Sequence, residues 1–94
     1  MSGASNAVQR LVEVLARALT DRPDDVRVTE SVQRGSTLVE LQVGTGEIGR
    51  VIGKQGRTAA ALRTLASIAA EKDGGTATLE IREPGRSGGP GGRE

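Results

Sequence analysis

Residues 43–63 read VGTGEIGRVIGKQGRTAAALR, and this stretch holds five of the chain's 14 glycines. Glycine carries no Cβ, so a cluster of glycines among apolar residues marks backbone that turns sharply or approaches a ligand closely. Three known motifs share parts of this stretch. The fold that we predict depends on which of the three is correct.

The first motif is the dinucleotide-binding turn. Gly44, Gly46 and Gly49 have its G-x-G-x-x-G spacing directly after an apolar segment. That turn needs an uninterrupted helix after its third glycine. Gly53 and Gly56 would lie inside that helix, and each would destabilise it by about 1 kcal/mol relative to alanine. The chain is also too short for a doubly wound sheet, so we treat the match as coincidence.

The second motif is the P-loop, whose end resembles Gly53-Lys54. A P-loop needs four residues between its glycines and a Ser or Thr after its lysine. Only three residues separate Gly49 from Gly53, and Gln55 follows the lysine. The sequence therefore fails this motif on both counts.

The third motif is a G-x-x-G link between two helices, formed by Gly53-Lys54-Gln55-Gly56. Its glycines let a sugar-phosphate chain approach closely, and the helix that starts near Arg57 directs free N–H groups at the phosphates. Lys54, Arg50 and Arg57 add positive charge around the loop. The G-x-x-G pattern alone is weakly specific, but it accounts for every glycine from 49 to 56.

The flanking segments predict a small α+β domain. Apolar residues recur at helical spacing in some segments and alternate with polar residues in others. Three strands with three helices on one face would make a two-layer structure. We predict helices over 5–20, 47–52 and 57–72, strands over 26–32, 37–43 and 76–82, a hairpin link over 33–36, and a left-handed helix cap over 73–75.

Each predicted element has an expected apolar face, and Ser5 is the expected N-cap of the first helix. Glu30 interrupts the alternation of apolar and polar residues in the first strand. We therefore expect the inward-facing side of this strand to lie at the edge of the sheet. The expected faces are Val8, Leu11, Val12, Leu15 and Leu19 in the first helix; Thr58, Ala61, Leu62, Leu65, Ile68 and Ala69 in the helix over 57–72; and, in the strands, Val26, Val28 and Val32, then Val39, Leu41 and Val43, then Ala77, Leu79 and Ile81.

The composition changes abruptly after Glu83. Residues 84–94, PGRSGGPGGRE, offer no apolar side chain to bury and are expected to form a disordered tail rich in Gly, Pro and Arg. We therefore predict one folded domain over residues 5–83.

Composition excludes most catalytic chemistry. The chain has no Cys and no His, which removes disulfides, thiolate chemistry, nearly all zinc sites and the usual general base. We expect no enzyme activity, no metal and no cofactor. No signal peptide and no membrane-spanning segment is recognisable, so a cytoplasmic protein is the default expectation.

Charge and aromatic content limit how the chain could bind nucleic acid. The net charge is only +1, so contact must come from a local basic cluster. Because Phe, Tyr and Trp are all absent, bases cannot stack on aromatic side chains. We expect weak, sequence-tolerant and salt-sensitive binding by a single domain.

The segment from Ile48 to Thr58, IGRVIGKQGRT, closely resembles the signature of the KH domain, in which a short apolar helix leads into I-G-K-x-G. The resemblance covers residues 7–83 and implies the type II order α-β-β-α-α-β. It further implies that the loop binds about four nucleotides of single-stranded RNA, with Leu38 or Val39 on the opposite wall. The RNA-binding residues that it implies are Gly53, Lys54, Gln55, Gly56, Arg57, Arg50, Ile48, Val51, Ile52 and Leu62.

Asp21-Arg22-Pro23 and Val51 to Thr64 are similar to the small bacterial KH domain protein A family. Membership would imply a cytoplasmic RNA-binding protein, acting as an RNA chaperone or post-transcriptional regulator linked to cell shape. It would also imply a homodimer, or a heterodimer with a larger Jag-type KH protein. The chain departs from the family pattern at Gly44-Thr45-Gly46, at Ala60 and in its tail.

An alternative is a protein–protein adaptor that keeps the KH shape and binds little RNA. Dimerisation would then use the small-residue face Ala59-Ala60-Ala61 with Leu65. Changes at these residues would abolish its activity, whereas changes in the G-x-x-G loop would have little effect.

Overall fold

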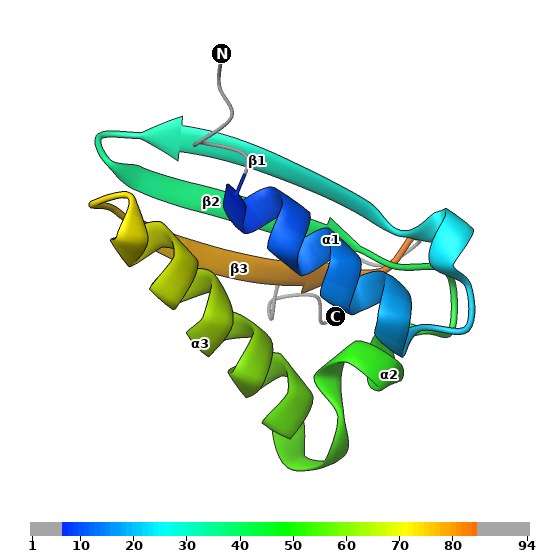
Figure 1. The fold of residues 1–94 in the computed structure, drawn as a ribbon. Helices are drawn as coiled ribbons and strands as arrows, with labels where there is room; N and C mark the ends of the chain where they lie inside the picture. Colours follow the sequence, from blue (N-terminus) through cyan, green and yellow to red (C-terminus); the bar gives the residue numbers. More distant parts are fainter. Residues whose placement is uncertain (1–6, 85–94) are drawn as a thin grey trace, which may run out of the picture.

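The structure, a computed structural model, describes residues 7–84 and has a three-stranded sheet as one of its layers (Figure 1). The strand order is β1-β2-β3, with β1 antiparallel and β3 parallel to the central β2. The elements are α1 (Ala7–Leu19), η2 (Pro23–Asp25), β1 (Arg27–Gln33), β2 (Ser36–Gln42), α2 (Ile48–Ile52), η3 (Lys54–Gly56), α3 (Arg57–Lys72) and β3 (Thr76–Arg82). The predicted α+β class and the order α-β-β-α-α-β are confirmed.

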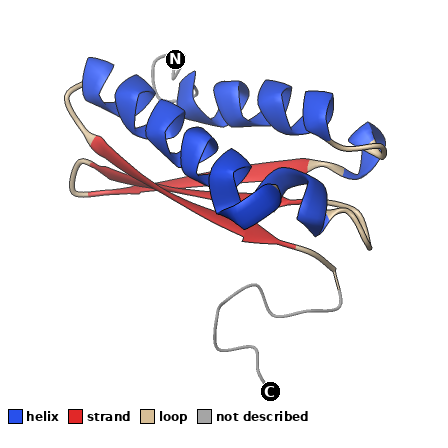
Figure 2. Cartoon of the chain, turned by 90° about the horizontal axis from the view of Figure 1, so that it is seen from below, coloured by secondary structure: helices blue, strands red, loops and turns tan. Residues whose placement is uncertain are grey.

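The helices form the second layer, on one face of the sheet (Figure 2). Helix α1 packs on β1 and β2, and α3 runs along β3. Helix α2 is only five residues long and contacts both longer helices at one end of the molecule. Two long helices and one short one therefore make up the three that were expected.

The parallel pairing of β2 with β3 determines where the glycine-rich stretch lies. Parallel neighbours need a crossover connection, because the chain must return to the same end of the sheet before the next strand begins. Helix α2, the loop and α3 together provide this crossover. The loop Gly53–Gly56 is consequently placed beyond the carboxyl end of β2, outside the sheet (Figure 1).

Two tight turns close the opposite end of the molecule. Arg34 and Gly35 have φ of 51° and 79°, as a two-residue type I′ hairpin requires. Helix α3 ends in a Schellman motif, in which Gly75 N–H donates to Ala70 O and Gly74, at φ 84°, donates to Glu71 O. Both predicted turns are thus present. Thr76 N–H also donates to Gly35 O at 3.2 Å, which joins the hairpin to the start of β3.

The core between the layers is entirely aliphatic. The strands contribute the predicted inward residues, with Val39, Leu41 and Val43 fully buried and Leu79 and Ile81 nearly so. The first strand buries less, since Val28 is half-buried and Val32 is 56% exposed. The predicted place of this strand at the sheet edge is confirmed, since within the described residues β1 pairs with β2 alone.

The predicted helix faces were wrong in part. In α1 the buried residues are Val8, Val12 and Ala16, while Leu19 is 39% exposed. In α3 the sheet is covered by Ala59, Leu62, Ala66 and Ala70, and the predicted Ala61, Leu65 and Ile68 face outward. The physical reason in α3 is the abundance of alanine, because several faces of this helix are equally apolar and close packing selects the one with the smallest side chains.

Ser5 and residues 85–94 lie outside the described residues, so the expected N-cap, the tail and the limits 5–83 remain predictions. Within residues 7–84, every helix is too short or too polar to cross a bilayer.

Candidate nucleic-acid interface

Helix α2 depends on tertiary contacts, because five residues are too few for a helix that is stable by itself. Val51 is fully buried in the core, and Ile48 and Ile52 pack against the core from its rim. These three predicted site residues thus fix the short helix that leads into the loop.

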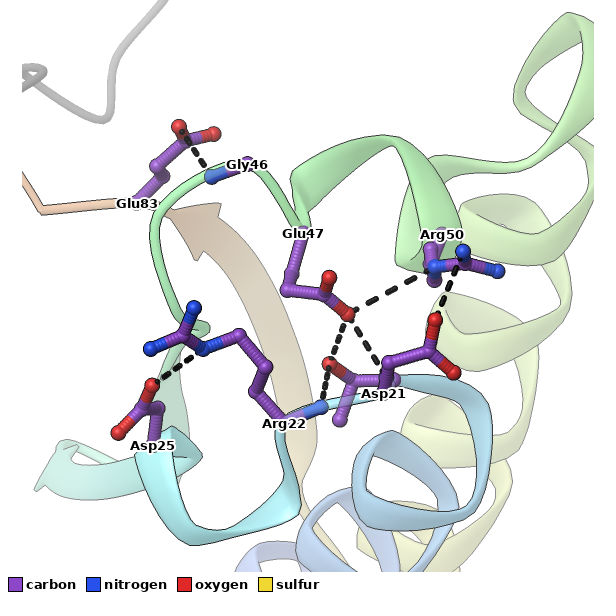
Figure 3. Close-up of polar contacts among 8 residues, drawn as sticks. Asp21, Arg22, Asp25, Gly46, Glu47, Arg50 and Glu83 are labelled. Atoms are coloured by element: carbon purple, nitrogen blue, oxygen red, sulfur yellow. Dashed lines mark hydrogen bonds and ion pairs between the residues drawn. The ribbon is translucent and has the colours of Figure 1, made fainter.

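Glu47 joins the start of α2 to the end of α1 (Figure 3). Its Oε1 accepts hydrogen bonds from Thr20 Oγ1 at 2.5 Å and from the Asp21 backbone N–H at 2.7 Å. Both Glu47 and Thr20 are buried. The Thr20 hydroxyl, then the Asp21 N–H, hold the pKa of the Glu47 carboxyl below its ordinary value of 4.5. Sequence patterns could not have revealed this contact, which joins residues 27 positions apart.

The first two glycines of the stretch have structural roles at the entrance to α2. Gly46 has φ of 84°, and its N–H donates to Glu83 Oε2 at 3.1 Å (Figure 3). Gly44 packs so closely on Asp25 that a Cβ there would lie 2.8 Å from Asp25 Oδ2. These contacts account for Gly44 and Gly46 without any dinucleotide.

The loop itself is a compact turn held by its own backbone. Gly53 N–H donates to Gly49 O at 2.9 Å, and Gly56 N–H donates to Gly53 O at 3.1 Å. Gly53, Gln55 and Gly56 have φ of 78°, 56° and 72°. Three positive φ values within four residues give a conformation that a loop without glycine would rarely adopt.

Gly53 is the loop residue at which only glycine fits. Its φ of 78° and ψ of 173° lie in a region that is essentially restricted to glycine. A Cβ at Gly53 would also lie 2.7 Å from the Cβ of Thr58 and still closer to the Thr58 hydroxyl. Sequence analysis predicts Thr58 on the apolar face of α3. In the structure its side chain packs against Gly53 of the loop.

The start of α3 lies next to the loop and has no side-chain cap. Its N-cap is Gly56, which has no side chain with which to cap the helix. The Arg57 N–H donates to Lys54 O, and the helix dipole places partial positive charge at this end of α3. Lys54, Gln55 and Arg57 are exposed around this end, and neither cation makes an ion pair with any residue between 7 and 84.

Arg50 differs from the other two cations. Its Nη2 lies 2.8 Å from Asp21 Oδ2, and its Nε lies 3.7 Å from Glu47 Oε1 (Figure 3). Its guanidinium is therefore held on the α1 side of α2 by two carboxylates.

The apolar site residues divide by burial. Ile48 and Ile52 keep part of their surface exposed, whereas Val51 and Leu62 are almost completely buried. The predicted opposite wall was wrong, because Val39 is fully buried and Leu38 lines a pocket with Ser31 and Thr78 on the other face of the sheet. The central strand β2 is also paired on both sides, so it offers no free backbone. Within the described chain, the strand edge beside α3 belongs to β3.

An open apolar groove of about 340 Å³ lies beside the loop, between α1 and α3. Leu15 and Leu19 line it from α1, and Thr58, Ala61 and Leu65 line it from α3. Arg57 lies at its loop end. The helix face that sequence analysis had placed in the core therefore forms an exposed surface.

Comparison with known proteins supports a family assignment. The family model described as "KhpA/KhpB, KH domain" matches residues 9–81. The RNA-binding protein KhpA of Halalkalibacterium halodurans is 49% identical over 74 residues, which cover 79% of this chain and 97% of that protein. The RNA-binding protein KhpA of Aquifex aeolicus is 45% identical over 78 residues, covering 83% and 99%.

The RNA-binding protein KhpA of Clostridium perfringens is 43% identical over 74 residues, covering 79% of this chain and 99% of that protein. No solved structure matches the chain. The match of the family model over most of the chain, together with these identities, shows that the chain belongs to the KhpA/KhpB family of KH domains.

Proposed function

We propose that this chain binds single-stranded RNA through the loop Gly53–Gly56 and the surface next to it. The single observation that carries the proposal is the loop's geometry. It is an exposed turn, packed on Thr58, that leads into a helix start without a side-chain cap and presents two cations without ion-pair partners among residues 7–84. Relatives named RNA-binding protein support the same ligand class.

The phosphates would bind at the tip of the loop. The open space at Gly56 leaves room for the sugar-phosphate backbone, and first-turn N–H groups of α3 after Arg57 would donate to phosphate oxygens. Lys54 and Arg57 contribute charge, Gln55 contributes an amide, and Arg50 lies one helical turn before the loop.

The bases would lie against the apolar side of the loop. Ile48 and Ile52 offer exposed aliphatic surface, and Val51 and Leu62 support it from the core. Backbone groups on the free edge of β3 are the candidates for hydrogen bonds to base edges. Because aromatic stacking is absent, affinity for one domain is expected to be low.

Useful affinity would come from two linked RNA sites. Pairing of two KH domains raises the effective concentration of the second site without any new contact to RNA. A homodimer, or a heterodimer with a larger KH-containing protein, fits this requirement. We place this RNA chaperone or regulator in the cytoplasm and assign it no enzyme activity.

The test is fluorescence anisotropy of labelled single-stranded RNA with the natural chain and with Lys54→Asp plus Gln55→Asp. This pair puts negative charge where the phosphates bind and keeps both glycines. Lys72→Asp plus Gln42→Asp is the control, because it makes the same charge change at two exposed positions outside the loop. We expect binding to be lost only in the loop variant, while circular dichroism shows all three chains folded.

The second candidate function is a protein–protein adaptor. The exposed apolar side chains of α3, Leu65 at 42% and Ile68 at 55% exposed, favour some protein contact on this helix. If the loop variant and its control bind RNA equally, or if the natural chain binds none across a range of salt, the adaptor replaces RNA binding as the function.

A further inference from the structure

The ion pair between Arg50 and Asp21 lies at the α1 side of the proposed site. Among the three cations assigned to phosphate, Arg50 is the one whose guanidinium is engaged by carboxylates within residues 7–84. The side chains of Arg50 and Asp21 remain 54% and 67% exposed. An incoming ligand can therefore reach both groups.

A phosphate and a carboxylate compete for the same guanidinium donors. Both are oxyanions that accept charge-assisted, often bidentate, hydrogen bonds from arginine. Arg50 cannot present the same N–H groups to Asp21 and to RNA at once. Asp21 also places a negative charge where a phosphate bound to Arg50 would lie, and this charge repels the phosphate.

The backbone of Asp21 is held independently of its carboxylate. Its N–H donates to Glu47 Oε1 at 2.7 Å, and the neighbouring Thr20 hydroxyl donates to the same oxygen (Figure 3). The Asp21 side chain extends from this anchored backbone toward Arg50. An exchange of carboxylate for amide at residue 21 therefore leaves both hydrogen bonds to Glu47 in place.

We propose that Asp21 limits the affinity of the loop for RNA by withholding Arg50 from the phosphate backbone. The inference rests on the proposed function and adds a specificity-determining residue on an element distant in sequence from the loop. In the free chain Arg50 pairs with Asp21. A strand bound at the loop either displaces the carboxylate or binds without Arg50, and both cases weaken the complex.

The test is a double-mutant cycle between Asp21→Asn and Arg50→Gln, measured as RNA dissociation constants over a salt series. We expect Asp21→Asn to tighten binding about two- to fivefold, in keeping with the modest strength of an exposed ion pair. The plot of log affinity against log salt should steepen by about 0.7, the change for one more phosphate contact on a single strand. In the Arg50→Gln background, Asp21→Asn should change neither quantity.

Glu13→Gln is the charge-matched control. Glu13 pairs with Arg17 at 2.8 Å within α1, so its loss also frees an arginine, but away from α2. This variant should bind RNA as the natural chain does. Asp21→Ser, which likewise keeps the backbone N–H, repeats the test with a different side chain.

The outcomes separate this inference from the proposed function. If the loop variant loses binding but Asp21→Asn and Asp21→Ser bind no more tightly than the natural chain, the inference is wrong and the RNA loop stands. An equal gain in the Arg50→Gln background would also overturn it, because the effect would not pass through Arg50. If the loop variant still binds RNA, the proposed function and the inference both fail.

Discussion

At the scale of single residues, the loop owes its shape to two glycines with different constraints. Gly53 combines a glycine-only backbone conformation with close contact to Thr58, whereas Gly56 has a left-handed φ of 72° and open space around its missing Cβ. Strain in the backbone affects both positions, but a steric clash affects only Gly53.

We therefore predict that Gly53→Ala is the more damaging substitution. It should lower the free energy of unfolding by about 2–4 kcal/mol, against about 1–2 kcal/mol for Gly56→Ala. Urea unfolding at neutral pH measures both values. Equal costs, or a larger cost at Gly56, would show that Thr58 does not constrain the loop.

A second prediction concerns Glu47 and pH. Its pKa in the folded chain is lowered by the Thr20 hydroxyl and the Asp21 N–H, so its contribution to stability is complete above the unfolded value of 4.5. That contribution is lost as pH falls through the lower pKa of the folded state. Glu30 acts in the opposite sense, because burial raises its pKa and its ionisation disfavours the folded chain.

Comparison of variants isolates the Glu47 contribution from that of Glu30. Glu47→Gln should lose less stability than the natural chain when urea unfolding is repeated from pH 5 down to about pH 3. Glu71→Gln, at an exposed position of α3, should follow the natural chain. A natural chain and a Glu47→Gln variant with parallel pH profiles would contradict the assignment.

At the scale of elements, the β1–β2 hairpin contains a residue that is poorly suited to its turn. Arg34 adopts φ of 51° in a type I′ turn that favours Asn or Gly at this position. Arg34→Asn should raise the free energy of unfolding by about 0.5–1 kcal/mol, which corresponds to a melting temperature higher by several degrees. Arg34→Ala, which changes the charge equally but does not favour positive φ, should give no such gain.

Glycine signals predicted the element boundaries well, whereas alanine obscured the orientation of α3. The limits Arg57–Lys72 and Thr76–Arg82 were predicted to the residue, because Gly56 and Gly74-Gly75 interrupt the pattern on each side. The face of α3 was mispredicted, since Ala59, Ala66 and Ala70 are as apolar in sequence as the exposed Ala60 and Ala61. Hydrophobic periodicity cannot show which alanines are buried, because that depends on how the helix packs against the sheet.

The candidate site was likewise predicted only where it is local in sequence. The loop and its cations lie within a few residues of one another, so their spacing was sufficient to identify them. Thr20 and Asp21, which anchor Glu47 and hold Arg50, lie just after α1. Such contacts depend on how α1 packs against α2, and no local pattern contains that information.

At the scale of the whole molecule, the exposed apolar face of α3 predicts self-association. Leu65 and Ile68 lie on this face, and Leu65 also lines the groove between α1 and α3. Sedimentation velocity should show a dimer for the natural chain that Leu65→Lys weakens at least tenfold, and the melting temperature should rise with protein concentration. Val32→Lys, at a similarly exposed valine on the edge strand β1, is the control. A monomer at all concentrations, or equal weakening by both variants, would contradict the prediction.

The central claim is that RNA binds at the loop Gly53–Gly56. Titration of the ¹⁵N-labelled chain with a short single-stranded RNA, followed by amide chemical shifts, tests it most directly. We predict that the largest shifts occur from Gly53 to Thr58, while Gly35 and Gly75 at the opposite end of the sheet stay unchanged. Shifts confined to the outer face of α3 or to the open face of the sheet, with the loop amides unmoved, would contradict the account.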